Sequence, residues 1–599
     1  MKLSPNFFDK LSGHPGKFSR VLEPGVCNTQ SFFLSSTATS NFEDTFNDWI
    51  VNDKVRRLWT RDASLWSMGN EAQWLGWLDI VDEQISNFGH LRDLAEDVGK
   101  AGFRDAIVLG MGGSSLCSVV LSSIFKPQSG FPRLHVLDST DPKQLRTLEK
   151  KIDYSTTLFI LASKSGSTLE LEILQRYFFN RILETVGTVQ APNHFIAITD
   201  PDSKLERIAL DQGFRHVFQG VRSIGGRYSA LSNFGMVPAT VMGVNVLSFL
   251  QNSNQMALAC SPGSSDSNNP GVALGALLGS LALEGRDKVT ILASSSVYDL
   301  GVWLEQLLAE STGKCGKGII PVDREPVGPP AVYGDDRVFI YMRLAEDEDD
   351  EQIQKLGELE SVGQPVVRIE IRDAYHLGQE WFRWEIATAV IGSILKVNPF
   401  DQPDVEAAKI VTRELIKSTK EPIPSPIERP FFCCEDIKLF ADETNISALC
   451  ATSGSHLSLA DYLRAHFNRI SPGDYLALLA YIEMNATHEE SLRRLRVAIR
   501  DAKCSATCVG FGPRFLHSTG QIYKGGPNTG VFLQITCDDT VDLPTPGRNY
   551  SFSTVKSAQA RGDFEALNER GRRSLRVHLS CDVSAGLTTL ETAVYEALR

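Results

Sequence analysis

Residues 105–115 read DAIVLGMGGSS, a short run of apolar and β-branched side chains that leads directly into a turn of three glycines and two serines. The apolar pattern LCSVVLSSIF follows and predicts a helix. The same order recurs in TLFILA (157–162) with SKSGST and LELEILQRYFF, and in HFIAIT (194–199) with DPDS and KLERIAL. Strand, polar turn and helix, three times over, predict a parallel sheet with helices on both faces.

The second half of the chain repeats this rhythm. KVTILA (288–293), the helical pattern LGVWLEQLLAES, VFIYMRLA (338–345) and PVVRIEI (365–371) indicate a second sandwich of the same kind. Further along, YLALLAYI (475–482) and GVFLQIT (530–536) indicate an additional α/β unit. The predicted fold class is therefore α/β, with two parallel-sheet sandwiches in tandem and a further unit after them.

Two stretches rich in Pro, Gly, Ser and Asn resemble linkers, CSPGSSDSNNPG (260–271) and TKEPIPSPIERP (419–430). The first hundred residues contain a Trp-rich stretch whose spacing suggests a packed helical cap. The predicted units are a mostly helical cap (1–100), a first sandwich (101–262), a second sandwich (263–430) and a C-terminal α/β unit (431–599).

Composition excludes several classes of protein. The chain has 599 residues, 42% hydrophobic and 22% charged, with a net charge of −13, which is opposite in sign to what wholesale binding of nucleic acid or anionic lipid requires. Its first residues lack the apolar core of a signal peptide, and its most apolar stretch (271–285) is shorter than the ~20 residues that span a bilayer. We expect a soluble, cytoplasmic protein with neither nucleic acid nor membrane as a partner.

The two glycine- and hydroxyl-rich turns are the first candidates for chemistry, because ligands of open α/β sheets bind beyond the carboxyl ends of the strands. In GMGGSS (110–115) the glycines let backbone N–H groups approach a ligand, and Ser114 can cap the next helix, although a tight strand-to-helix turn explains the motif equally well. In SKSGST (163–168) four hydroxyls gather at a predicted helix N-terminus, which favours an anion. Neither turn fits a nucleotide-binding pattern, so a phosphomonoester remains.

Charged side chains in three later segments add further candidates. Arg227 follows two glycines in SIGGRYSAL (223–231) and is either a structural ion-pair partner or an electrophile aimed at a substrate oxygen. Glu310 ends an apolar helix and lies about 140° around it from Glu305, so that one carboxylate can face a cleft while the other is solvated.

NPFDQPDVEAAK (398–409) places Pro403 in the first turn of a predicted helix. Gln402 and Lys409 are seven residues apart and therefore share one side of that helix. The alternative for Lys409 is an ion pair with Glu406, three residues earlier.

The glycine and hydroxyl turns on neighbouring strands resemble the sugar-isomerase (SIS) domain, a phosphosugar-binding module. The ordered series GMGGSS, SKSGST, GGRYS, AESTGK and NPFDQPDVEAAK resembles the glucose-6-phosphate isomerase family. The later stretch 512–534, GPRFLHSTGQIYKGGPNTGVFLQ, resembles the C-terminal part of the isomerase half of bifunctional transaldolase/glucose-6-phosphate isomerase proteins. Because no region offers the eight strand–helix units of a transaldolase barrel, we expect isomerase activity only.

This resemblance implies a reversible aldose–ketose isomerisation of glucose 6-phosphate and fructose 6-phosphate through a cis-enediolate, without a metal or organic cofactor. It implies that Glu310 is the base, that Arg227 stabilises the enediolate and that Lys409 assists ring opening. A carboxylate can take a carbon-bound proton only where a fixed positive group holds the developing oxyanion.

The resemblance also implies the groups that bind the phosphosugar. Ser163, Ser165 and Thr168 would hold the phosphate, with Lys164 in the same turn; Gly113 and Ser114 would line the sugar end; and Gln402 would contact it from the other domain. It suggests a homodimer as well.

One departure from the family concerns its ring-opening histidine, which lies between the segments that match Glu310 and Lys409. This chain is short there and offers only His376, on the helix that leads to the lysine motif. His517, in FLHSTGQIYKGG, is the predicted substitute, because a histidine beside Gly- and hydroxyl-rich sequence can reach a cleft and titrates near neutrality.

Two other functions compete with this one. An aminosugar-phosphate isomerase or lyase could be built on the same pair of domains, but Arg227, Glu310 and the segment with Gln402 and Lys409 speak against it. A non-catalytic phosphosugar sensor would keep the phosphate-binding turn without the catalytic groups, whereas this chain keeps them.

Overall fold

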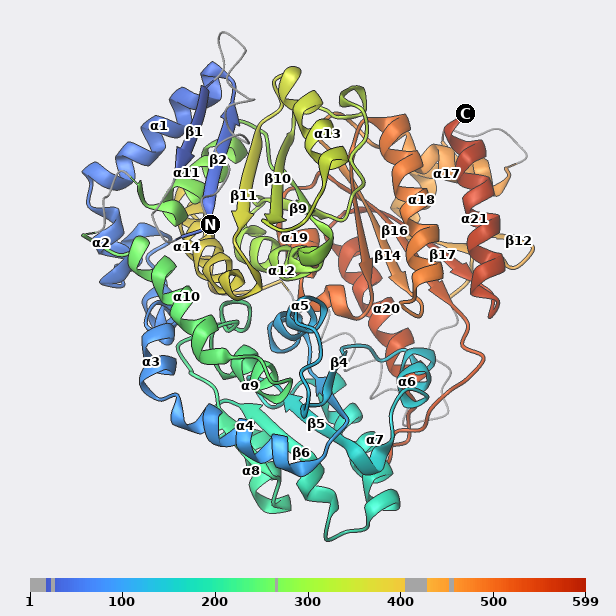
Figure 1. The fold of residues 1–599 in the computed structure, drawn as a ribbon. Helices are drawn as coiled ribbons and strands as arrows, with labels where there is room; N and C mark the ends of the chain where they lie inside the picture. Colours follow the sequence, from blue (N-terminus) through green and yellow to red (C-terminus); the bar gives the residue numbers. More distant parts are fainter. Residues whose placement is uncertain (1–17, 23–26, 264–267, 405–427, 452–456) are drawn as a thin grey trace.

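The computed structural model describes residues 18–22, 27–263, 268–404, 428–451 and 457–599, and it contains three separate β-sheets with helices packed around them (Figure 1). The α/β fold class with parallel sheets is confirmed.

The first sheet contains five parallel strands in the order β4-β3-β5-β6-β7. The three predicted strands form its middle, and two further strands, which the sequence patterns did not indicate, lie at its edges. Its strands are β3 (Asp105–Leu109), β4 (Arg133–Leu137), β5 (Thr157–Ala162), β6 (Phe195–Thr199) and β7 (His216–Gln219).

The central strands are buried on both faces because alternate side chains enter two different cores. Val108 and Ile160 pack into the large core shared with the second sheet, whereas Ile107 and Phe159 pack into a second core against helices α6, α7 and α8. Burial on both faces explains why these strands are continuous apolar runs, and it places the polar turns at the sheet edge.

The second sheet has the order β1-β2-β11-β10-β8-β9. Its four later strands are mutually parallel; three of them were predicted, and β9 was not. Strand β2 pairs antiparallel with β11, and β1 pairs antiparallel with β2. The segment predicted as a helical cap therefore also supplies two strands to a sheet formed more than 250 residues later. The strands are β1 (Phe18–Leu22), β2 (Thr29–Leu34), β8 (Lys288–Ala293), β9 (Ile320–Asp323), β10 (Arg337–Leu344) and β11 (Val366–Ile371).

The third sheet belongs to the C-terminal unit and has the order β12-β13-β17-β16-β14-β15. Its last four strands along the chain are parallel, and β13 runs antiparallel beside β17. The strands are β12 (Phe432–Cys434), β13 (Ile437–Phe440), β14 (Tyr475–Tyr481), β15 (Ala506–Phe511), β16 (Gly530–Cys537) and β17 (Arg573–Leu579).

Helices fill the connections between strands. Those of the first part of the chain are α1 (Ser36–Val51), α2 (Lys54–Trp59), α3 (Ile80–Ser86), α4 (Gly89–Ala101), α5 (Leu116–Ile124), α6 (Pro142–Glu149), α7 (Leu169–Val186), α8 (Lys204–Gln212), α9 (Asn233–Val241) and α10 (Val246–Ala259). Those that follow are α11 (Pro270–Leu283), α12 (Leu300–Thr312), α13 (Asp350–Ser361), α14 (Leu377–Leu395), α16 (Glu443–Cys450), α17 (Leu459–Phe467), α18 (Ala486–Lys503), α19 (Gly520–Gly525), α20 (Phe552–Glu569) and α21 (Val583–Leu598).

The most apolar helix, α11, lies in the interior, where it packs against α14 and α1. Within the described ranges, no helix has the length and apolar character needed to cross a membrane.

Candidate active site

Two glycine-rich turns meet at the junction of the first and second sheets. A Cβ atom on Gly113 would lie 2.1 Å from the carbonyl carbon and oxygen of Gly226, so this contact requires glycine. Gly112 has a positive φ of 53° and lies against the backbone carbonyl of His517. The GMGGSS turn is thus packed between the turn that carries Arg227 and a segment of the C-terminal unit.

The SKSGST turn gathers its hydroxyl groups at the start of α7. Ser163 Oγ lies 3.0 Å from Thr168 Oγ1 and accepts a hydrogen bond from the N–H of Gly166, whose φ is 64°. Thr168 is the N-cap of α7, yet its side chain makes no capping hydrogen bond. The hydroxyls therefore bond within the turn and leave the first N–H groups of α7 uncapped by a side chain.

Two details of these turns differ from the predictions. Lys164 Nζ donates to Asp200 Oδ2 (2.6 Å) and to the carbonyl of Val221 (2.8 Å), so its ammonium group is engaged away from the hydroxyls of its own turn. The prediction that Ser114 caps α5 is wrong: Ser114 lies in a single 3₁₀ turn, the N-cap is Ser115, and no side chain caps the helix.

Arg227 is buried, 2% exposed, and its guanidinium joins the two sheets. Its Nε donates to Ser311 Oγ (2.7 Å) and its Nη1 to Gln402 Oε1 (3.0 Å). Its Nη2 donates to the carbonyls of Pro399 (2.6 Å) and Asp401 (2.9 Å). These contacts fix the charge in one position and bring Gln402 beside it, a contact that the sequence did not predict.

Glu310 lies in the last turn of α12 and is 8% exposed. Its Oε1 is 3.6 Å from Arg227 Nη1, and its Oε2 accepts a hydrogen bond from Gln306 Nε2 (2.9 Å), one helical turn earlier. These two charged groups are 83 residues apart in the sequence, and the fold places the carboxylate beside the fixed cation.

His517 reaches the same site from the C-terminal unit. Its backbone carbonyl accepts a hydrogen bond from Gln306 Nε2 (2.8 Å), the amide that also contacts Glu310. Its imidazole Nε2 lies 2.8 Å from Oε1 of Glu170, in the first turn of α7 beside SKSGST. His517 therefore lies between α7, which follows the SKSGST turn, and α12, which carries Glu310.

Lys314, in the AESTGK motif, is a buried cation that sequence analysis did not single out. Its Nζ donates to the carbonyls of Ser311 (3.2 Å) and Asn398 and pairs with Asp401 Oδ1 (2.9 Å). Burial, followed by the nearby charge of Arg227, lowers the pKa of Lys314 to about 7. The connection from α12 to β9 contains two lysines, Lys314 and Lys317, and the sequence does not show that Lys314 is the buried one.

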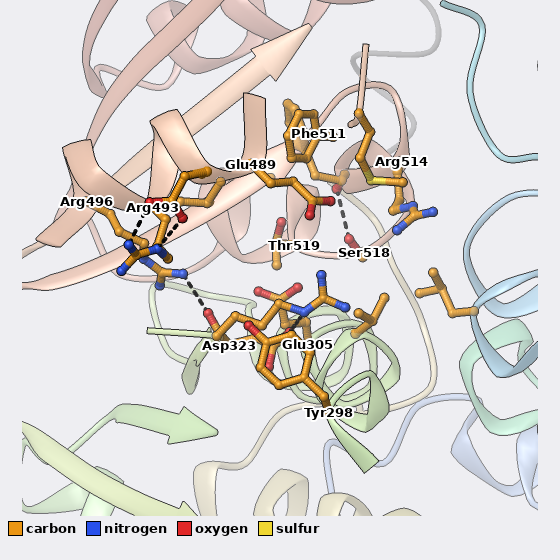
Figure 2. Close-up of a pocket in the computed structure, with 18 of the residues that line it drawn as sticks. Tyr298, Glu305, Asp323, Glu489, Arg493, Arg496, Phe511, Arg514, Ser518 and Thr519 are labelled. Carbon is orange, nitrogen blue, oxygen red and sulfur yellow. Dashed lines mark hydrogen bonds and ion pairs between the residues drawn. The ribbon is translucent and has the colours of Figure 1, made fainter. Parts of the chain in front are cut away.

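The sequence predicted that one of the two carboxylates of α12 faces a cleft and that the other is solvated. Glu305, the carboxylate that faces away from the site, is not on an open solvated face. It lies on the other side of α12, half-buried, in a cavity of about 300 Å³ between the second sheet and the C-terminal unit. Figure 2 shows Glu305 near Asp323 and Tyr298 on one side, with Ser518 and Thr519 of the C-terminal unit across the cavity. Burial, followed by the charge of Asp323, raises the pKa of Glu305 well above its ordinary value.

The remaining predicted residues have different outcomes. Lys409 lies outside the described residues. His376 is at the N-cap of α14, with its Nδ1 2.9 Å from Asp373 Oδ1, and forms no hydrogen bond or ion pair with Glu310 or Arg227.

Among the described side chains, no group of three or more His, Cys, Asp or Glu residues has the geometry to hold a metal ion.

Residues 78–321 match the family described as phosphoglucose isomerase. The chain is 24% identical over 384 residues to a probable glucose-6-phosphate isomerase of Methanococcus maripaludis, covering 58% of this chain and 85% of the relative. It is 29% identical over 366 residues to a glucose-6-phosphate isomerase of Rubrobacter xylanophilus, covering 53% of this chain and 84% of the relative.

Two solved structures have a similar fold. A crystal structure of a glucose-6-phosphate isomerase from Chlamydia trachomatis covers 67% of this chain and 90% of its own, with a TM-score of 0.53 and 17% identity. A crystal structure of a hypothetical protein from Thermus thermophilus covers 66% of this chain and 99% of its own, with a TM-score of 0.55 and 22% identity. The segment that is similar to the phosphoglucose isomerase family, residues 78–321, contains the two turns, Arg227 and Glu310.

Proposed function

We propose that the protein interconverts glucose 6-phosphate and fructose 6-phosphate, an aldose–ketose isomerisation of glycolysis and gluconeogenesis. The observation that carries the proposal is the Glu310 carboxylate 3.6 Å from the fixed, buried guanidinium of Arg227, at the end of a phosphosugar-type sheet. The family match over this segment and the names of its relatives support the same reaction.

Glu310 takes the proton from C2 of the open-chain aldose and returns it to C1. The negative charge that develops on the substrate oxygen meets Arg227, whose hydrogen bonds to Ser311 and Gln402 hold it in place without reorganisation. Gln306 orients the carboxylate through its hydrogen bond to Oε2. Two fixed groups of opposite charge in a buried site can thus move a carbon-bound proton.

The substrate phosphate binds at SKSGST, where Ser163, Ser165 and Thr168 supply hydroxyls beside the uncapped start of α7. Gly113 and Ser114 line the sugar between this turn and Arg227, and Gln402 contacts the substrate from the segment after α14. The participation of Lys409 in ring opening remains part of the proposal, carried by the family motif.

His517 opens the sugar ring in this proposal. Its position between Glu170 and Gln306 supports the role, because an imidazole oriented by a carboxylate is suited to move a proton to or from a ring oxygen. The enzyme would act in the cytoplasm on a phosphosugar alone. A homodimer is proposed from the resemblance, and its mass in solution tests it.

The test is conversion of fructose 6-phosphate to glucose 6-phosphate, measured through a coupled dehydrogenase. Glu310→Gln should lower kcat by about 10²- to 10⁴-fold, as for loss of a general base. Glu305→Gln, on the opposite side of the same helix, is the matched control and should keep turnover within a few-fold. No turnover in the wild type with phosphosugar binding intact would favour the sensor, and full turnover in Glu310→Gln would remove Glu310 as the base.

A further inference from the structure

The third sheet has the strand order that creates a binding crevice in doubly wound α/β units. From β14 the chain passes to β15 on one side, then returns to β16 and β17 on the other, so the order reverses between β14 and β16. In such sheets ligands bind beyond the carboxyl ends of the strands at this reversal. The relevant strand ends here are Tyr481 of β14 and Cys537 of β16.

A cavity of about 600 Å³ lies at that place, and its lining includes Tyr481, Thr536 and Cys537. One wall comes from the N-terminal half of α20, which supplies Ser557 and Arg561 among others. Figure 1 shows α20 between the third sheet and the first sheet. This cavity is separate from the site that contains Glu310 and Arg227, none of whose residues line it.

The lining is cationic, although the chain as a whole carries a net charge of −13. It includes the four cations Lys438, Lys556, Arg561 and Arg576 and the single carboxylate Glu428. Most of the carboxylates that pair with these cations are not in the lining, so an anion in the cavity meets mainly positive groups.

The four cations differ in how much of their charge is already matched. Lys556 is paired with Asp141 (2.9 Å) and Asp539 (2.5 Å), and Arg576 is paired with Glu428 (2.6 Å). Lys438 is exposed, and its ammonium group makes no hydrogen bond or ion pair within the described part of the chain.

Arg561 has one partner among the described residues, Glu565 Oε1 at 2.7 Å from its Nε, and its side chain is 21% exposed. Its two terminal nitrogens therefore remain as donors beside the cavity. Lys438 therefore provides the unmatched positive charge, and Arg561, whose charge is matched by Glu565, adds guanidinium donors.

A hydroxyl group completes the donor set. The exposed Ser557 offers it from α20. The hydroxyl of Thr536 is already engaged, because Asp538 Oδ1 accepts from His578 Nε2 (3.2 Å) and His578 Nδ1 in turn accepts from Thr536 Oγ1 (2.9 Å). Guanidinium, ammonium and hydroxyl donors around one cavity match the oxygens of a phosphate group.

We propose that this cavity is a second anion site, in which Lys438, Arg561 and Ser557 bind the phosphate group of a small phosphorylated metabolite. It is independent of the isomerase reaction proposed above and does not use its residues.

The site is also joined to the catalytic region by α20. Between Lys556 and Arg561 this helix carries Gln559, whose Nε2 donates to Glu170 Oε1 (2.6 Å), the carboxylate that contacts His517. A ligand in the cavity therefore contacts the same helix that hydrogen-bonds to Glu170, the carboxylate beside His517.

The experiment is calorimetric titration of the full chain with inorganic phosphate and, separately, with fructose 6-phosphate at millimolar concentrations. Wild type should show two sites, one at SKSGST and one at the cavity. Lys438→Gln/Arg561→Gln should weaken the second site tenfold or more, because charge-assisted hydrogen bonds are lost, and should leave KM for fructose 6-phosphate unchanged. Ser163→Ala/Thr168→Ala should lose the other site and keep this one.

The control for net charge is Lys100→Gln/Lys355→Gln, which removes two positive charges from surface residues, each of which pairs with a glutamate on its own helix. It should retain both sites. Tighter binding of the sugar phosphate than of inorganic phosphate at the cavity would identify an ester as the ligand, and equal binding would identify free phosphate. A single site in wild type, or two unchanged sites in Lys438→Gln/Arg561→Gln, would overturn the proposal.

Discussion

The imidazole Nε2 of His517 lies 2.8 Å from the Oε1 atom of Glu170, although 347 residues separate them in the chain. Glu170 stands in the first turn of α7, beside SKSGST, and His517 ends a 3₁₀ helix (Arg514–His517) of the C-terminal unit. A carboxylate that contacts one ring nitrogen fixes the orientation of the ring and leaves the other nitrogen for the substrate. The C-terminal unit thus supplies a group to a site built mainly by the first two sheets.

His517→Asn tests the role in ring opening. We expect about a hundredfold lower kcat on fructose 6-phosphate, since general acid–base catalysis contributes 10²–10⁴-fold. On 5-deoxyfructose 6-phosphate, which cannot close its ring, turnover should stay within a few-fold of wild type. Equal losses on both substrates would show that His517 only supports the structure. Glu170→Gln, a change in a positioning residue, should show the same selectivity with a smaller loss.

Arg227→Lys should not be tolerated, because a single ammonium cannot replace the contacts to Ser311, Gln402, Pro399 and Asp401. We expect kcat/KM to fall by about 10²- to 10³-fold and the free energy of unfolding by about 2 kcal/mol, as buried acceptors lose their donors. Kinetics and urea denaturation measure the two effects. Arg222→Lys, whose side chain is 60% exposed, is the control and should change neither; wild-type kinetics in Arg227→Lys would contradict the assigned role.

Gly113→Ala tests the contact between the two glycine turns. The new Cβ would be 2.1 Å from the Gly226 carbonyl, so the turns must separate, and overpacking of this kind costs about 1–3 kcal/mol. We expect a lower melting temperature and a higher KM. At Gly225 a Cβ would meet only the Phe400 carbonyl at 3.8 Å, and Gly225→Ala should behave as wild type. Equal stability and activity of the two variants would show that neither property depends on the close contact between Gly113 and Gly226.

Lys314 should make stability depend on pH in the alkaline range. Its pKa is about 7 in the folded protein, below the ordinary 10.5, so between these values the unfolded chain binds more protons and stability rises with pH. For one proton the slope is at most about 1.4 kcal/mol per pH unit. Urea denaturation at pH 7, 8 and 9 should therefore show wild type gaining stability relative to Lys314→Met. A constant difference between the two proteins would contradict a lowered pKa.

The sequence predicted the parts of the fold that rest on local patterns. The strands β3, β5 and β6 are buried on both faces, so each is an uninterrupted apolar run followed by its polar turn. Edge strand β4 has exposed and half-buried side chains and no such run. Strand β2 was missed for another reason: its alternating pattern is short, and its partner β11 lies more than 300 residues away.

In the candidate site, too, single residues could be predicted from local motifs, whereas their contacts could not. The motifs identified Arg227, Glu310 and Gln402 separately, and only the tertiary structure shows that one guanidinium contacts both of the others. Lys314 could not be ranked from sequence, since its unusual pKa arises from burial beside Arg227. The similarity of residues 512–534 to bifunctional proteins stays a prediction.

The antiparallel pairing of Phe33 with Val366 sets the order in which the chain can fold. During synthesis, β2 leaves the ribosome long before β11 has been made. The edge of β2 that pairs with β11 therefore stays unpaired while most of two domains is synthesised. Loop closure over this distance is slow, and an unpaired edge strand is a site of aggregation. Refolding yield, more than catalysis, should therefore suffer from changes in Thr29–Leu34.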